Sequence, residues 1–475
     1  MLRHAKLRRR SWTTLLAALV VVVACAPRQP IDLLVVAGTV VDPSREGPLR
    51  VDVAVDDGRI VAVGEDLSRR FVASTTLDAS ERFVIPGLAD LHSHFGNGIL
   101  GPGEDDTTQV LARHLYYGNT TILNLGSAQA WPERIDELRA ALDAGDIEGP
   151  RLLAVGSLIT RVGSHPTTTI YSPALQERIA AIVADAPPSG PIDLTPLRAT
   201  TLVRTPEDVG EEVRRVGAWG ADAIKITVES GPPEFGVHPR MTPEMIAAAV
   251  EAARPFGIPV LCHISMLPEL EDCIAQGAQG AVHGITPEAP LPDDLESRMT
   301  AAGFALIPTA AMFDGWARLA SAPEWLDDPF LAETMGERER AWLGSAEMIA
   351  AMAWDDALPV ERLGAHIARL DAVGGLVAAG TDTGNPYRFA GHALHEEIAF
   401  YARHGLTPRR ALATATVNAA RLLGAENEWG AIRTGLAADL VVLEGNPYDA
   451  IENTRSIVEV VRAGRVIDRA TLPVR

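Results

Sequence analysis

The sequence predicts an α/β protein in which a (β/α)8 barrel, the TIM-barrel architecture, is joined to a small β-sandwich formed from both chain ends. Two observations predict this fold class. The middle of the chain alternates strand-like apolar segments with helix-like segments, as parallel barrels do. Both ends carry short β-like runs separated by turns. The expected boundaries are 1–24 for a signal peptide of the lipoprotein type, 25–85 and 426–475 for the two parts of the sandwich, and 86–425 for the barrel.

The sandwich is predicted from the texture of the two ends. Between residues 31 and 84, short alternating apolar runs are separated by turns, and the Asp57-Gly58 pair between two of these runs is a hairpin signal. The same texture returns at 438–443 and 457–467. Two β-rich ends that enclose a different middle predict one small domain built from both.

The barrel is predicted from eight strand-like segments, most of them separated by helix-like runs. The strands are expected at 88–92, 120–125, 151–155, 223–228, 259–264, 280–283, 305–309 and 376–381, and the helix-like runs include 136–144, 206–219, 243–255 and 291–302. Two connections are long: 160–205 is polar and proline-rich, and 313–370 is mostly helical. In this fold such insertions lie on the catalytic face, where they shape access for a substrate.

Composition limits the function classes. Of 475 residues, 47% are hydrophobic and 22% are charged, which is typical of a soluble globular protein. A formal net charge of −20, without a basic patch, argues against a nucleic-acid partner and leaves a small-molecule substrate. Cys262 and Cys273 lie in a strand-like and a helix-like run, which favours two buried thiols over a disulfide.

The first 24 residues have the pattern of an export signal. A basic head is followed by an apolar stretch, 15–23, that is too short to span a bilayer comfortably. The stretch ends in Val22-Val23-Ala24-Cys25, which resembles the bacterial lipobox. We therefore expect an exported lipoprotein, anchored through Cys25 to a bacterial membrane and facing the periplasm or the cell exterior. The alternative is an uncleaved N-terminal anchor helix.

Lysine is rare in this chain, since Lys6 and Lys225 are the only two among 42 basic side chains. Lys225 lies in an apolar run, 221–228, that predicts a buried strand, where a lone ammonium is costly. Unlike arginine, a desolvated lysine can lose its proton and react with carbon dioxide. The resulting carbamate is a carboxylate that can bridge two metal ions. The alternative is a single lysine left by chance in an arginine-rich composition.

Candidate metal ligands fall at the C-terminal ends of the predicted strands, where a barrel places its chemistry. They are His92, His94, Lys225, His263, His283 and Asp382. The first two are two residues apart in a strand, so their side chains face the same side and can hold one ion. A solitary histidine is usually an ordinary packed or exposed residue. Six such residues in barrel order instead indicate a metal site.

Several motifs resemble a known family. The segment from Pro86 to His94, Pro-Gly-Leu-Ala-Asp-Leu-His-Ser-His, looks like the first-strand motif of the amidohydrolase superfamily, and the order His-x-His, Lys, His, His, Asp is similar to its binuclear type. Further segments are similar to the imidazolonepropionase-related, prolidase-like branch. These segments are 220–226, 380–384, 391–397, 405–408 and 411–416, and the similarity spans about residues 31–470.

The resemblance implies a site and a mechanism. His92, His94 and Asp382 would bind one ion, and His263 and His283 a second. Carbamylated Lys225 (N6-carboxylysine) would bridge the two ions together with a hydroxide, whose formation two cations favour near neutral pH. Asp382 would act as general base and then as general acid towards the leaving nitrogen. Zinc is the expected metal, with manganese or iron as alternatives.

Residues expected near the barrel mouth are candidate substrate contacts. They are His165, Tyr171, Asn385 and Arg388, each with an ordinary loop role as the alternative. Arg388 can hold a substrate carboxylate bidentately. Prolidase-like relatives often carry an aromatic residue directly after the fifth-strand histidine. Here Ile264 takes that place, which argues against a dipeptide substrate.

The leading hypothesis is therefore a binuclear metal-dependent hydrolase of an amide-type C–N bond, in a peptide, an N-acyl amino acid or a cyclic amide. One alternative is a mononuclear deaminase of the same superfamily. Those enzymes lack the bridging lysine and usually place a glutamate where this chain has Met266. Lactone or ester hydrolysis remains open, and so does a catalytically silent solute-binding protein. The sequence leaves the oligomeric state open, a homo-oligomer included.

Overall fold

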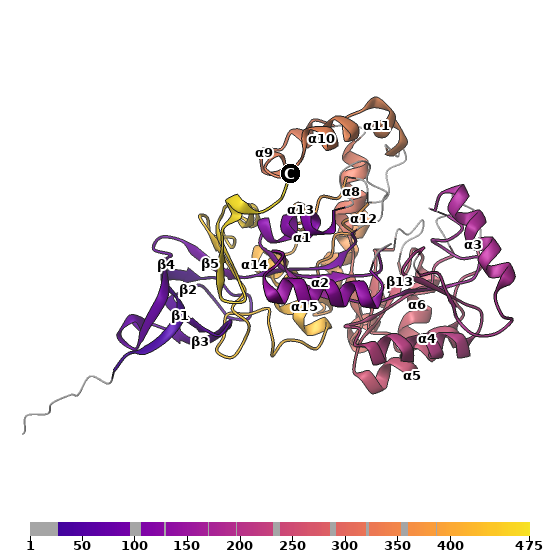
Figure 1. Cartoon of the computed structure of the whole chain (residues 1–475), viewed down its shortest axis with the longest axis horizontal. Coiled ribbons are helices and arrows are strands. Elements are labelled where there is room, and N and C mark those ends of the chain that lie inside the picture. The colour runs from indigo at the N-terminus through magenta and orange to yellow at the C-terminus, as the bar shows by residue number, and fades with distance from the viewer. Residues whose placement is uncertain are drawn as a thin grey trace, which may run out of the picture.

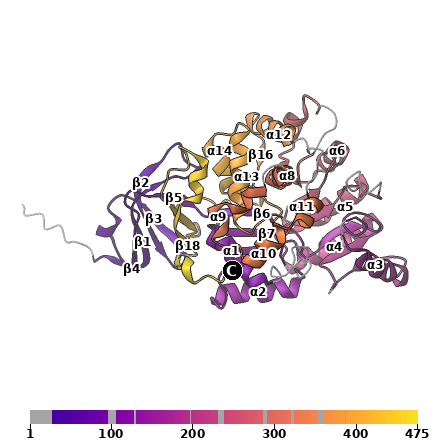
Figure 2. The same cartoon turned by 90° about the horizontal axis from the view of Figure 1, so that it is seen from above.

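The structure is a computed structural model, and it describes residues 27–95, 106–127, 130–169, 171–195, 197–230, 238–285, 291–319, 323–352, 360–385 and 387–475. The expected signal peptide, 1–24, and Cys25 lie outside these residues. A β-rich lobe lies at one end of the molecule and a larger α/β body makes up the rest (Figures 1 and 2). Within the described ranges, no helix has the length and apolarity that a membrane crossing requires.

The β-rich lobe is built from both chain ends, as predicted. Its strands are β1 (Gln29–Val40), β2 (Leu49–Asp56), β3 (Arg59–Gly64), β4 (Phe71–Asp78), β5 (Phe83–Pro86), β17 (Leu440–Leu443), β18 (Ile457–Arg462) and β19 (Arg465–Ile467). They form one hydrogen-bonded sheet in the order β19-β18-β17-β5-β1-β2-β3, with β4 paired to β1. The antiparallel pair β5–β17 joins the two ends, Ile85 opposite Val441. Positive φ angles at Asp57 and Gly58 form the predicted hairpin turn between β2 and β3.

The α/β body contains the parallel strands expected of the barrel. These are β6 (Leu88–Ser93), β7 (Asn119–Asn124), β8 (Arg151–Ala154), β9 (Leu158–Arg161), β12 (Ile224–Thr227), β13 (Val260–His263), β14 (Gly280–Val282), β15 (Ala305–Ile307) and β16 (Leu376–Val377). The segment that follows β16 lies beside β6, where Leu91 N donates to Ala379 O at 3.0 Å. This contact joins the last strand of the barrel to the first. Apolar side chains on the inner side, among them Leu91, Leu261 and Ile307, fill the interior beneath the strand ends.

The third barrel strand agrees with the predicted 151–155 in its first part, β8, but it resumes beyond the predicted end as β9. Its first part, β8, pairs with β7, and its continuation, β9, pairs with β12. Gly156 lies between the two parts with a φ of 74°, a left-handed conformation that glycine adopts without a steric penalty. The interruption lets each part pair with a different neighbour.

The connection at 160–205 forms an ordered lobe. It contains α3 (Pro173–Asp185), β10 (Ile192–Asp193) and β11 (Thr200–Val203). Strand β11 pairs in parallel with β9 and extends the sheet outward, and Ile179, Ile192 and Leu202 form a small core. Helix α3 lies at the end of the molecule opposite the β-rich lobe (Figures 1 and 2).

Helices cover the strands and also make up the second long connection. The first group is α1 (Thr107–Tyr116), α2 (Pro132–Ala144), α4 (Pro206–Trp219), α5 (Pro243–Ala253), α6 (Leu267–Ala275), α7 (Leu295–Ala301), α13 (His392–Arg403), α14 (Pro408–Thr414) and α15 (Val417–Leu422). The connection at 313–370 is mostly helical, as predicted, with α8 (Ala310–Leu319), α9 (Pro329–Ala332), α10 (Glu337–Leu343), α11 (Ala346–Met352) and α12 (Val360–Ala372). Helix α4 begins with a capping box in which Thr205 accepts from the backbone of Asp208 and Asp208 accepts in return. Cys262 and Cys273 are buried free thiols, as expected.

Candidate metal centre

One group of predicted ligands meets where the first and eighth strands end. The Nε2 atoms of His92 and His94 lie 3.2 Å apart. Oδ1 of Asp382 lies 3.2 Å from Nε2 of His92 and 3.0 Å from Nε2 of His94. Three donor atoms therefore point at one spot, from a His-x-His pair on β6 and from the loop after β16.

The glycines around Asp382 explain how this loop approaches β6 so closely. A Cβ at Gly380 would lie 2.8 Å from Cβ of His92 and 2.5 Å from Ile307, and a Cβ at Gly384 would lie 2.7 Å from Cβ of His94. The backbone N–H of Asp382 donates to the carbonyl of His92 at 2.7 Å. The Gly-Thr-Asp-Thr-Gly motif thus combines close backbone contact with a carboxylate at the strand end.

A second group forms beside the first. Nδ1 of His263 on β13 lies 3.2 Å from Nε2 of His283, which follows β14. The rings of His283 and His92 are 4.9 Å apart between centroids, so the two groups adjoin. Nζ of Lys225 on β12 lies 3.3 Å from Nε2 of His92, and its side chain is almost entirely buried. The structure brings all six predicted ligands together.

Three residues around the centre have left-handed backbones although none is glycine. The φ angles are 69° at His283, 49° at Thr309 and 57° at Asp382, in the segments that follow β14, β15 and β16. Such conformations cost about 1–3 kcal/mol each and persist only where the surrounding structure holds them. At Thr309 that support is visible, because the Glu397 carboxylate accepts hydrogen bonds from the next two backbone N–H groups.

Hydrogen bonds outside the centre determine which ring nitrogens face it. Nδ1 of His94 lies 2.7 Å from the carbonyl of Gly126, which can only accept, so Nδ1 carries the proton and Nε2 keeps its lone pair. Nδ1 of His283 lies 2.8 Å from Oγ1 of Thr309, which leaves Nε2 towards His263. This pattern, one nitrogen held and the other free, is typical of histidines that bind metal.

Burial sets the charges of the donors. It lowers the pKa of His92 and of His263 well below the usual range, and the nearby Lys225 lowers both further. Burial also lowers the pKa of Lys225 to about 8. For Asp382, burial acts to raise the pKa, but the imidazoles of His92 and His94 hold it well below its ordinary value. Neutral imidazoles beside a charged carboxylate form the ligand set that divalent cations need.

The remaining predicted residues divide into two pairs. His165 and Asn385 lie beside the candidate ligands, whereas Tyr171 and Arg388 pack elsewhere. His165 lies beside the centre, its ring centroid 4.9 Å from that of His263. Asn385 lies next to Asp382, whose backbone carbonyl accepts from Asn385 Nδ2 at 3.1 Å. Tyr171 packs in the core of the 160–205 lobe, with the guanidinium of Arg198 4.9 Å from its ring centroid.

Arg388 has an internal partner in the structure. Its side chain is 0% exposed, and Nη1 lies 3.4 Å from Oε2 of Glu396 on α13. Its guanidinium packs where a side chain at Gly315 of α8 would otherwise lie. Burial lowers the pKa of Arg388, and Glu396 opposes that effect. The structure therefore directs Arg388 between α8 and α13, which gives no support to the predicted contact with a substrate carboxylate.

Sequence reasoning missed one acidic residue, Glu229. Its side chain is 2% exposed, and Oε1 lies 3.1 Å from Nδ1 of His165 and 3.2 Å from Nε2 of His263. The available signal was its position four residues after Lys225, because side chains at even spacing along a strand share a face. An acidic residue at the end of a buried apolar run, in register with a predicted ligand, was a candidate for the same site.

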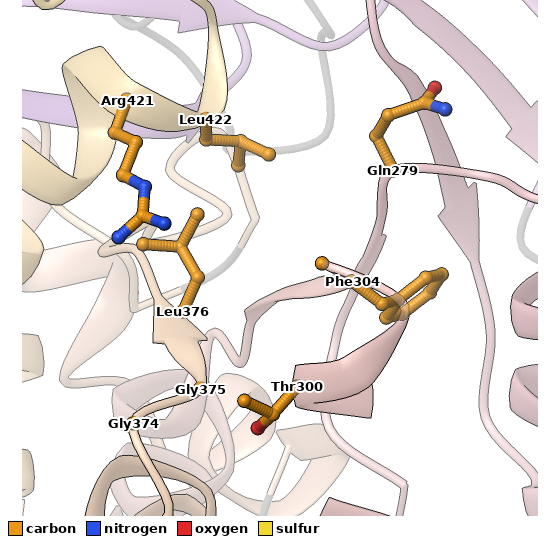
Figure 3. Close-up of a pocket in the computed structure, with 9 residues that line it drawn as sticks. Gln279, Thr300, Phe304, Gly374, Gly375, Leu376, Arg421 and Leu422 are labelled. Atoms are coloured by element: carbon orange, nitrogen blue, oxygen red, sulfur yellow. The ribbon is translucent and has the colours of Figure 1, made fainter. Parts of the chain in front are cut away.

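A cavity of about 240 Å³ lies elsewhere in the body. Figure 3 shows Leu376, Arg421 and Leu422 on one side of it and Gln279 and Phe304 on the other. Gln279 and Phe304 directly precede β14 and β15, so the cavity lies at the N-terminal ends of the strands. The metal ligands follow the C-terminal ends, which in a parallel barrel form the opposite face. The cavity is therefore separate from the candidate centre.

Comparison with known proteins identifies the fold and the family. Ochratoxinase from Aspergillus niger is 25% identical over 464 residues, covering 91% of this chain and 86% of the fungal chain. A crystal structure of a Xaa-Pro dipeptidase with bound methionine matches 92% of this chain and 99% of its own, with a TM-score of 0.68 and 23% identity. Phenylurea hydrolase B matches 93% and 98%, with a TM-score of 0.69 and 21% identity. The model of the amidohydrolase family matches residues 83–467, and the chain is a hydrolase that belongs to this family.

Proposed function

We propose that the chain is a binuclear metal-dependent hydrolase of an amide-type C–N bond. The observation that carries the proposal is the convergence of six donor side chains at the strand ends, with the lone buried lysine among them. His92, His94 and Asp382 would hold one divalent ion, and His263 and His283 a second. Zinc suits this nitrogen and oxygen donor set, as do manganese and iron.

Lys225 would be the bridge between the two positions. As a neutral amine, its Nζ forms a bond to the carbon of CO₂ and releases one proton, which yields a carbamate. The side chain is buried among the ligands, and without such a change it would place an amine where an anionic ligand is needed. A mononuclear deaminase has no comparable use for this residue, so we do not favour that alternative.

A pair of ions in these positions would activate a water molecule and polarise the scissile carbonyl. The residues of the chain would orient the reactants and move the proton. Asp382 lies within hydrogen-bonding distance of the proposed ligand nitrogens of both His92 and His94, so its carboxylate is at the candidate centre. It would take one proton from that water and give it to the leaving nitrogen.

The amide-type bond is supported by the relatives. The names of the proteins compared above refer to ochratoxin, to Xaa-Pro dipeptides and to phenylureas. Dipeptides and phenylureas share a carbonyl carbon bonded to nitrogen. Because Ile264 and not an aromatic residue follows His263, we expect N-acyl amino acids or cyclic amides to be better substrates than dipeptides.

The test combines metal counting with a substrate panel. The purified chain should contain two divalent ions, and it should hydrolyse members of a panel of N-acyl amino acids, lactams, dipeptides and matched esters. Lys225→Ala should lose one ion and lower kcat/KM by more than about 100-fold, beyond the cost of removing an outer partner of a ligand. Ile226→Val, a mild change on the same strand, is the control. Full metal content and turnover in Lys225→Ala would refute the bridge, and hydrolysis of esters alone would refute the amide assignment.

We also propose that the chain is exported and held at a bacterial membrane by lipidated Cys25. The support is the basic and apolar N-terminal pattern that ends in this cysteine. Metabolic labelling with a fatty acid should mark the wild type and leave Cys25→Ser unlabelled. Labelling of both proteins, or of neither, would contradict the anchor.

A further inference from the structure

We propose that Glu229 is a positioning residue whose single carboxylate fixes two imidazoles at once, that of His263 for metal binding and that of His165 for contact with substrate. The inference rests on the proposed function, because it takes His263 as a metal ligand. It adds a residue that neither the family motifs nor the predicted ligand set includes.

Glu229 lies between the two histidines and is held firmly there. Its Oε1 lies 3.1 Å from Nδ1 of His165 and 3.2 Å from Nε2 of His263. Its backbone is fixed on both sides, since Val228 N donates to the carbonyl of His263 and Ser230 N donates to the carboxylate of Glu269. These hydrogen bonds fix the backbone that carries the carboxylate.

The contact with His263 favours one tautomer. Oε1 lies 3.2 Å from Nε2 without a hydrogen bond of ordinary geometry, and a carboxylate oxygen this close favours the proton on Nε2, which leaves the lone pair on Nδ1. That Nδ1 is the atom 3.2 Å from Nε2 of His283. The arrangement matches the carboxylate–histidine–metal pattern, in which an outer carboxylate orients the ring and raises the basicity of the ligand nitrogen.

The contact with His165 has the same consequence on the other side. Nδ1 faces both Glu229 and Oγ1 of Thr169, which lies 2.7 Å away. With the proton on Nδ1, Nε2 is an acceptor, and within the described residues it has no hydrogen-bond partner. His165 thus offers an acceptor beside the centre, where it suits a substrate N–H or O–H.

The same three side chains also form a group whose donor atoms lie within 4.8 Å of one another, as a cation site would. That reading would use Nε2 of His263, whereas the proposed centre uses Nδ1 of the same ring. The geometry favours the centre, because Nδ1 of His263 faces Nε2 of His283, whose ring adjoins that of His92. A cation between Glu229 and His165 is therefore the competing outcome for the experiment.

The experiment measures metal binding and substrate binding separately in the full-length protein. Glu229→Gln should still fold, and Zn²⁺ competition against a chelating dye should show one of two ions bound about 10- to 100-fold more weakly. The visible spectrum of the Co²⁺ form should change for that one ion. Glu296→Gln is the matched control: this buried glutamate on α7 also contacts a buried histidine, His366 on α12, and neither residue belongs to the candidate ligand set. It should leave both affinities unchanged.

His165→Ala separates positioning from cation binding. It should keep both zinc affinities and raise KM with little change in metal content. Equal loss of an ion from His165→Ala and Glu229→Gln would overturn the proposal in favour of a cation site, as would three ions in the wild type. Unchanged zinc affinity in Glu229→Gln would overturn it outright. If the wild type itself holds fewer than two ions, the proposed function fails whatever the variants show.

Discussion

Gly380 offers a stringent test of how the eighth strand shapes the centre. Replacing it with alanine would place a Cβ 2.5 Å from Ile307 Cγ2, 2.8 Å from Cβ of His92 and 2.9 Å from the backbone nitrogen of His92. Ordinary contact begins at 3.4 Å, so atoms must move by roughly 0.5 to 0.9 Å. The neighbouring backbone of β6 cannot swing aside like the end of a flexible side chain, so His92 would be displaced.

The displacement should have two consequences. Overpacking of this kind costs about 1–3 kcal/mol of unfolding free energy. A shift approaching 1 Å in a catalytic group can lower the rate about 100-fold. Urea denaturation measures the first effect, and metal content with kcat/KM measures the second. Gly47→Ala is the control, because nothing lies within 4 Å of a Cβ there. Wild-type stability and turnover in Gly380→Ala would refute the close approach of the eighth strand to His92.

Three further predictions follow from other parts of the fold. Arg113→Ala should lower the free energy of unfolding, measured by urea denaturation, by about 3–5 kcal/mol, because it removes the Arg113 side of the buried ion pair with Glu339. A loss below about 1 kcal/mol would show that the pair is dispensable. Burial acts to raise the pKa of Glu296, but hydrogen bonds from His366 and Arg369 lower it to about 2. Ionised Glu296 therefore contributes its full stabilisation at pH values above its ordinary pKa of 4.5, and this stabilisation is lost as the pH falls towards 2. Glu296→Gln should make the free energy of unfolding depend less on pH in this range. Removing metal with a chelator should lower Tm, and adding Zn²⁺ back should restore it, because ions that bind only the folded chain stabilise it; an unchanged Tm would argue against bound ions.

The third barrel strand and the loop residues show where prediction from sequence stops. At Gly156 the strand changes its pairing, from β7 for its first part to β12 for its second, and a local apolar run does not reveal which strands it will pair with. Arg388 follows the Asp382 motif closely enough to suggest a place at the mouth. The direction of the Arg388 side chain is decided by two contacts. Glu396 lies on α13, which follows later in the chain, and the space at Gly315 lies on α8, which is distant in sequence.

The sequence by itself determined the barrel order and the six candidate ligands. Parallel strands place their C-terminal ends on one face, so polar residues that end successive apolar runs must gather there. Only the tertiary structure placed Glu229 between His165 and His263, because that contact needs the loop after β9, the end of β12 and the end of β13 to meet. Periodicity along one segment determines which face a side chain occupies. Its partner across the fold is determined by the packing of segments that the local pattern does not connect.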